Sequence, residues 1–136
     1  MLRRSLLALS VAVGAFAMIS ASMPSGAAPA PSVSRRILLT QDLSIPNYQT
    51  NFVEVIIPAG GREGRHTHPG SAVVHVLEGS LTLDMEGLPS KTYQVGETFY
   101  IDSGKVHEGI NNGAGRVKAL ASFVVEKGKP LASPAQ

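Results

Sequence analysis

The chain has 136 residues, which is the size of one domain with a single hydrophobic core. It contains no cysteine, which excludes disulfides, cysteine metal ligands and a cysteine nucleophile, and no tryptophan, which argues against an aromatic groove for nucleic acid. Its 12 basic residues outnumber its 10 acidic ones, but removing Arg3 and Arg4 with an N-terminal signal leaves 10 of each. Charge therefore predicts no nucleic-acid partner.

The N-terminus has the layout of a secretory signal peptide. Arg3 and Arg4 precede an apolar run from Leu6 to about Ala21, and small residues and prolines follow. Because this run is shorter than the ~20 residues of a usual membrane-spanning helix, we expect cleavage within residues 21–28 and no stable membrane anchor afterwards. The protein is then periplasmic or secreted. The arginine pair fits both the general and the twin-arginine export routes.

After this segment, short strands alternate with turn residues along the chain. A Pro-, Ala- and Ser-rich linker covers residues 27–34, and no later stretch repeats apolar residues at helical spacing. A tight turn is expected at Glu78-Gly79-Ser80. Many short strands with Gly and Pro turns predict a closed or two-sheet antiparallel β fold. The expected strands are residues 51–57, 73–77, 81–86, 93–95, 98–101, 107–110 and 117–125.

The four histidines carry the clearest chemistry. His66 and His68 are two residues apart, so on an extended strand their imidazoles share a face. His75 follows on the next predicted strand, and His107 lies on a later one. Neutral imidazole is a common ligand of divalent metals. Two nitrogens from one strand and a third from another suit a metal inside a β-barrel.

The segment around the first histidines resembles the first motif of the cupin family. That motif runs Gly, five residues, His-x-His, three or four residues, Glu, six residues, Gly. Gly60, His66, His68 and Gly79 occupy its places. Ala72 stands where the family has its Glu.

The segment around the last histidine resembles the second cupin motif, which runs Gly, five residues, Pro-x-Gly, two residues, His, three residues, Asn. Gly96, Gly104, His107 and Asn111 match it, and Asp102 replaces the proline. The resemblance covers about residues 53–125. It implies an all-β fold, a single-domain cupin-type double-stranded β-helix (jelly-roll barrel). The organisation is then a signal peptide at 1–27, a linker and N-terminal arm at 28–50, the barrel at 51–126 and a flexible tail at 127–136.

The resemblance also implies a metal site. It assigns His66, His68 and His107 as ligands of a divalent transition metal (Fe, Ni, Cu, Zn or Mn), with nothing from Ala72. Three imidazoles leave positions open for water or substrate, as in catalytic metal sites. Some cupins, the thiol dioxygenases among them, work with three histidines and no carboxylate.

Other candidates depend on local geometry. His75 points away from the predicted site by strand alternation, and joins it as a fourth ligand only if a bulge near Pro69-Gly70 resets the phase. Asn111 shares the face of His107, where it orients a ligand or closes a turn. Arg62 and Arg65 precede the histidines in the sequence. We expect them either to hold an anionic substrate at the pocket mouth or to be simply solvated. The nearby carboxylates, for which we assign no catalytic role, are Glu63, Glu78, Asp102 and Glu108.

Two functional hypotheses follow. The first is an exported small cupin that binds a divalent metal through three histidines and is a dioxygenase-like or other metal-dependent enzyme acting on a small molecule. The second is a non-catalytic cupin module that binds a small ligand, with the metal structural or absent. The resemblance implies a homodimer in either case. No catalytic residue and no organic cofactor are assigned.

Overall fold

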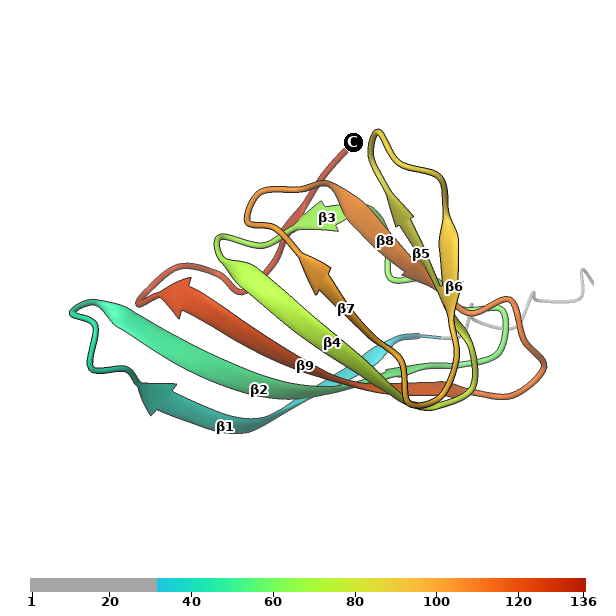
Figure 1. The fold of residues 1–136 in the computed structure, drawn as a ribbon, viewed down its shortest axis with the longest axis horizontal. Coiled ribbons are helices and arrows are strands. Elements are labelled where there is room, and N and C mark those ends of the chain that lie inside the picture. Colours follow the sequence, from blue (N-terminus) through green and yellow to red (C-terminus); the bar gives the residue numbers. More distant parts are fainter. Residues whose placement is uncertain (1–31) are drawn as a thin grey trace, which may run out of the picture.

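The computed structural model describes residues 32–136, and these form ten β-strands without a helix (Figure 1). Within this range, no helix exists that is long and apolar enough to cross a membrane. The expected signal peptide at 1–27 lies outside the described residues. The all-β prediction is confirmed. The strands are β1 (Ser34–Asp42), β2 (Tyr48–Ile57), β3 (His66–Thr67), β4 (Ser71–Glu78), β5 (Leu81–Met85), β6 (Lys91–Tyr93), β7 (Thr98–Ile101), β8 (His107–Ile110), β9 (Val117–Glu126) and β10 (Ser133–Pro134).

The strands form two antiparallel sheets of five. One has the order β1-β2-β9-β4-β7 and the other the order β10-β3-β8-β5-β6. In Figure 1 the two sheets lean against each other and enclose the core between them. Strand β9 shows why they pack: from Val117 to Val125 every second side chain is buried, and those between are more exposed. Full burial of one Val or Phe side chain stabilises a fold by about 1.5–3 kcal/mol, so this alternation fixes which face of the sheet turns inward.

The turn between β4 and β5 depends on one glycine. Gly79 has a φ of 76°, a left-handed conformation that residues with a Cβ adopt at a cost. A Cβ there would also lie 2.6 Å from the carbonyl oxygen of Arg116. The turn expected at residues 78–80 is therefore present, and both backbone angle and space demand its glycine.

Two segments outside the expected barrel form strands, and β6 lies two residues earlier than the strand expected at 93–95. Strand β1 extends the larger sheet from the part expected to be a linker and arm, and it pairs with β2 over nearly its whole length. All nine of its residues are exposed, so it carries no burial alternation for a sequence pattern to show. At the other end, within the expected flexible tail, Ser133 and Pro134 pair with Thr67 and His66 of β3. Both the first and the last strand of the described range thus take part in the sheets.

Candidate metal centre

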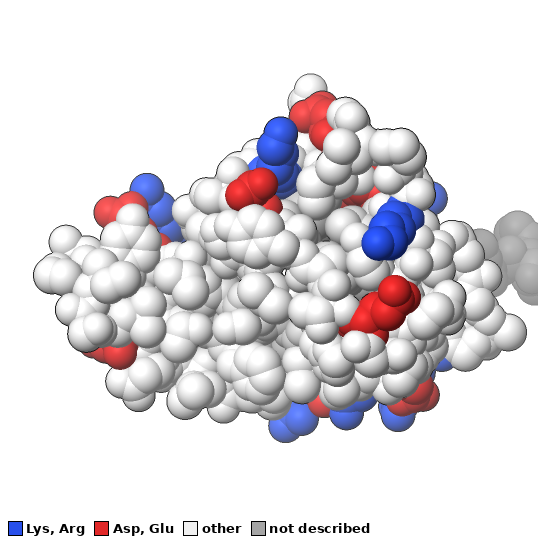
Figure 2. Space-filling view, in the orientation of Figure 1, with Lys and Arg blue, Asp and Glu red and all other residues white. Residues whose placement is uncertain are grey.

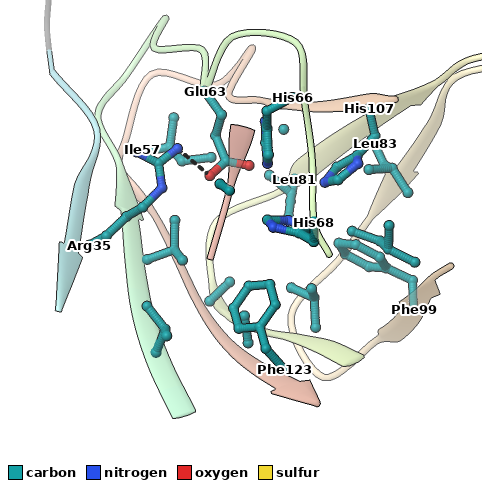
Figure 3. Close-up of a pocket in the computed structure, with 18 of the residues that line it drawn as sticks. Arg35, Ile57, Glu63, His66, His68, Leu81, Leu83, Phe99, His107 and Phe123 are labelled. Carbon is teal, nitrogen blue, oxygen red and sulfur yellow. Dashed lines mark hydrogen bonds and ion pairs between the residues drawn. The ribbon is translucent and has the colours of Figure 1, made fainter. Parts of the chain in front are cut away.

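Two neighbouring strands bring the three motif histidines together. His66 of β3 is the register partner of His107 of β8, and His68 lies just beyond β3. All three side chains are buried, and their ring centroids lie 4.3–4.9 Å apart. One nitrogen of each ring lies within 4.8 Å of the other two. Figure 3 shows the three rings grouped on one side of the barrel interior, above Phe123, whose ring packs 4.7 Å from that of His68.

A backbone carbonyl orients each of the three histidine rings. Nδ1 of His66 lies 2.7 Å from the carbonyl oxygen of Gly64, and Nδ1 of His107 lies 2.8 Å from that of Lys105. Nδ1 of His68 lies 2.7 Å from the carbonyl oxygen of Leu131. A carbonyl only accepts hydrogen bonds, so each Nδ1 carries the proton and donates it. Each Nε2 is left with a free lone pair, which is the arrangement that metal-ligating histidines use.

Burial favours the neutral form of two of these imidazoles, those of His68 and His107. Removal from water lowers the pKa of His68 from 6.5 to about 4, although its hydrogen bond to the Leu131 carbonyl acts in the opposite direction. Burial also lowers the pKa of His107. Metal binding requires neutral imidazole, so these two residues need not lose a proton at neutral pH to become ligands.

The histidines line a cavity of about 110 Å³ in the barrel interior. Its walls are mostly apolar, and the small side chains of Ala119 and Ala121 on β9 contribute to the space that remains. Within residues 32–136, two charged side chains line it, those of Arg35 and Glu63. The other lining residues are Val53, Val55, Ile57, Val74, Leu81, Leu83, Phe99, Ile101, Gly109, Val117, Phe123, Leu131 and Ala132.

His75 does not join the three histidines. Its Nδ1 lies 2.8 Å from the hydroxyl of Thr98, and it occupies the face of β4 opposite to the buried Val74 and Val76. No inserted residue resets the alternation between His68 and His75, so even-numbered residues continue to point inward. Ala72 is one of them and is buried. β4 therefore offers the site no carboxylate.

Asn111 and Arg65 also lie outside the cavity lining. Asn111 is buried, and its amide Nδ2 donates to the carbonyl oxygens of Ile57, Pro58 and Gly115. Its Oδ1 accepts from the Gly113 amide, so the side chain closes the turn after β8. Arg65 faces acidic groups of the β5 region, with 3.6 Å to a carboxylate oxygen of Asp84 and 3.9 Å to Glu86.

Arg62 and Glu108 pair with each other. Arg62 donates to both carboxylate oxygens of Glu108, at 3.0 and 2.6 Å, and these bonds lower the pKa of Glu108. The Gly64 amide donates to the same carboxylate at 3.1 Å. This pair anchors the segment before His66 to β8, and so supports the carbonyl that holds His66.

Three residues of the site had no assigned role in the sequence analysis. Arg35 on β1 and Glu63 in the loop before β3 form an ion pair at the cavity, and Leu131 near the C-terminus supplies the carbonyl for His68. None of them belongs to a spaced motif. The sequence shows that Glu63 lies three residues before His66. That spacing does not predict whether its side chain points into the cavity.

The donor set fits a divalent transition metal. Three converging imidazoles with free Nε2 atoms suit zinc, iron, nickel or copper, and the absence of a carboxylate ligand makes the site less suited to harder ions such as Mn²⁺. The sequence matches the Cupin domain family over residues 53–123. The chain belongs to the cupin family. No curated protein matches the chain.

Several solved structures share the architecture. A double-stranded β-helix protein from Klebsiella pneumoniae aligns with a TM-score of 0.62 at 18% identity, over 84% of this chain and 90% of its own. The DMSP lyase DddQ from Ruegeria pomeroyi aligns at 0.58 and 22% identity, over 63% of this chain. An oxalate oxidase in complex with glycolate aligns at 0.56 and 25% identity, over 62% of this chain. The aligned part spans only 43% of the lyase and 45% of the oxidase.

Proposed function

We propose that this cupin is a metal-dependent enzyme that acts on a small oxygen-bearing molecule inside the barrel. The observation that carries the proposal is the set of three Nδ1–H···O=C hydrogen bonds, which turn the Nε2 lone pairs of His66, His68 and His107 toward a common space. A pocket that only needed to be filled would not require three buried imidazoles whose Nδ1 atoms each donate to a backbone carbonyl.

The surrounding residues define what the site accepts. A divalent metal held there would polarise a substrate oxygen and, if it were iron or copper, would add redox chemistry. The apolar walls exclude bulk water and strengthen electrostatic interactions inside. A cavity of about 110 Å³ is smaller than the cavity of about 150 Å³ that holds benzene in another protein, so the substrate is compact. The names of two structural neighbours, an oxalate oxidase and a DMSP lyase, are consistent with small substrates.

A second candidate is a non-catalytic module that binds a small ligand. It is favoured by Ala72, the buried alanine in the place of the family's Glu, because three neutral ligands hold a dication less tightly than three neutral ligands and a carboxylate. In that case the metal would be a structural element or absent, and the apolar cavity alone would bind the ligand.

Metal analysis followed by turnover assays separates these candidates. The mature protein is purified without chelator beside His66→Ala/His68→Ala, with His75→Ala as a control that removes a histidine outside the cluster. We expect near-stoichiometric metal in the wild type and in His75→Ala, and none in the double variant. Oxygen uptake or product formation with a panel of small hydroxy and keto acids, enols and thiols supports the enzyme. Full metal content without turnover or oxygen uptake across the panel supports the binding module.

We also propose that the protein is exported, on the strength of the signal-like sequence at residues 1–27. The test is to express the full chain with Arg3→Lys/Arg4→Lys alongside and to determine the N-terminus of the product in the exported fraction. A new N-terminus within residues 22–29 supports cleavage. An intact Met1 in the membrane fraction contradicts it, and loss of export in the double-lysine variant alone favours the twin-arginine route.

The outer face of the larger sheet is the surface that we propose for pairing two copies. One register row crosses all five strands through Leu39, Phe52, Ser122, Val73 and Tyr100. Leu39, Val73 and Tyr100 are 47–53% exposed. In Figure 2 the charged side chains lie mostly toward the margins of the view and leave a broad uncharged area. Such a patch is typical of an interface.

Substitution within this row tests the dimer. Val73→Asp is expected to convert a dimer to a monomer in sedimentation analysis, because it buries an unpaired charge in the interface. Val95→Asp is the matched control, since Val95 is equally apolar and 60% exposed but lies between β6 and β7. A wild-type monomer, or a Val73→Asp dimer, contradicts the proposal.

A further inference from the structure

The cavity contains one carboxylate, and it does not come from the family motif. Glu63 lies in the loop before β3, and its side chain is only 15% exposed. In Figure 3 it points down into the pocket, between Arg35 and the histidines. Among the described residues, no other acidic side chain lines the cavity. Ala72 leaves the usual position without a carboxylate, and Glu63 brings one into the cavity from the loop before β3.

A glycine on β8 makes room for this carboxylate. Gly109 is two residues beyond His107 and therefore on the same inward face of the strand. A Cβ on Gly109 would overlap Oε2 of Glu63. Any other residue at 109 would thus displace the carboxylate. The amide of Glu63 also donates to the Gly109 carbonyl at 2.9 Å, which holds the loop against this strand.

Arg35 sets the direction of the carboxylate. Its guanidinium donates to Oε1 of Glu63 at 2.9 Å from β1. Among residues 32–136, no group donates a hydrogen bond to Oε2, the oxygen that lies over Gly109. One carboxylate oxygen is therefore anchored, and the other keeps its capacity to accept a hydrogen bond inside a mostly apolar cavity.

We propose that Glu63 is the hydrogen-bond acceptor for ligands held at the three-histidine site, with Arg35 as its positioning residue and Gly109 as the gap that admits it. The ligands it selects are small molecules that carry a hydroxyl group. This role rests on the proposed metal site. A hydrogen bond from a hydroxyl to a buried carboxylate is expected to change affinity about tenfold or more.

The test uses the protein loaded with Co²⁺, whose visible spectrum reports ligand binding without turnover. Glycolate and acetate are titrated separately, and the ratio of their affinities is compared between variants. Glu63→Gln, Glu63→Ala and Gly109→Ala are expected to lower the preference for glycolate about tenfold, and Arg35→Lys to lower it less. Because Gly109→Ala acts by displacing Glu63, it should have no further effect in the Glu63→Ala background.

Glu78→Gln is the matched control, because Glu78 also pairs with an arginine, Arg116, but outside the cavity. It should leave the ratio unchanged. If Glu63 and Arg35 only tie β1 to the loop, their variants will lower the melting temperature and leave the ratio as in the wild type, which overturns the proposal. Wild-type protein that binds no Co²⁺ overturns the metal site itself, and this role for Glu63 with it.

Discussion

The three histidines of the centre are oriented in two different ways. His66 and His107 each donate to a carbonyl two residues earlier in their own segment, Gly64 and Lys105. His68 donates to Leu131, 63 residues later. Two ligands are thus fixed by local backbone, whereas the third is fixed only when the end of the chain has closed over the barrel. Part of the site is complete once β3 meets β8, and the rest requires the whole fold.

The C-terminal segment is therefore part of the candidate metal centre. Pairing of β10 with β3 places Leu131 over His68, and the amide of Ala135 donates to the Arg65 carbonyl at 2.9 Å. These contacts hold the carbonyl of residue 131 in place, in the way that hydrogen-bond partners outside a metal site hold its ligands. The local and the remote histidines can be separated by experiment.

The largest effect is expected from removing a locally oriented ligand. His107→Ala leaves two imidazoles, and we expect the affinity for Zn²⁺ to fall by more than about 100-fold, beyond the 10- to 100-fold cost of losing an outer partner. Isothermal titration calorimetry measures it. His75→Ala removes an imidazole from the opposite face of the sheet and should leave the affinity unchanged. Equal affinity of His107→Ala and wild type would falsify the three-histidine site.

The burial of His68, whose hydrogen-bond partner is remote in sequence, should make the free energy of unfolding depend on pH. In the unfolded chain His68 takes up its proton near pH 6.5, and in the folded protein only near pH 4, because burial opposes the charge. Between these values the unfolded state binds more protons, so the free energy of unfolding should fall as the pH is lowered from 6.5 to 4, by at most about 3 kcal/mol from this residue.

Urea unfolding of the metal-free protein at several pH values measures this decrease. His68→Gln should flatten the slope, and the part that remains should come in part from His107, whose pKa is also lowered by burial. An unchanged slope in His68→Gln would show that the buried His68 does not govern acid stability.

Truncation tests the remote orientation directly. Removal of residues 131–136 deletes the carbonyl that holds His68 but leaves the partners of His66 and His107. We expect Zn²⁺ affinity to fall about 10- to 100-fold, which is less than for loss of a ligand. Removal of Gln136 alone is the control and should have no effect. If the longer truncation keeps full affinity and a folded circular dichroism spectrum, Leu131 does not orient His68.

Most of the fold was predictable because its strands carry a burial alternation. Strands β2, β4, β5, β7 and β9 show inward apolar residues at every second position, and Gly-containing turns separate several of them. Strand β1 was not predictable in this way, since both of its faces are exposed at the edge of the sheet. β10 is two residues long and contains a proline, so no pattern marks it.

Only the site residues that lie within the two motifs could be predicted from the sequence. Alternation placed His66 and His68 on one face and the two motifs added His107, whereas Arg35, Glu63 and Leu131 come from segments without any periodic signal. Their positions depend on long-range closure: Arg35 on the β1–β2 register, Leu131 on the β10–β3 register. Glu63 depends on the missing side chain at Gly109, which a sequence shows only as one glycine among 14.

The smallest expected effect comes from the local hydrogen bond that orients His66. Gly64 has a φ of 78°, and its carbonyl orients His66. Gly64→Ala should cost about 1 kcal/mol of stability through left-handed backbone strain, and should weaken Zn²⁺ binding a few-fold as the carbonyl shifts. Gly87→Ala is the matched control: its φ is 80°, both sites have open space for a Cβ, and Gly87 follows β5 away from the cavity. It should lose similar stability at unchanged affinity. Equal zinc affinities for the two variants would mean that β3 itself, rather than this carbonyl, orients His66.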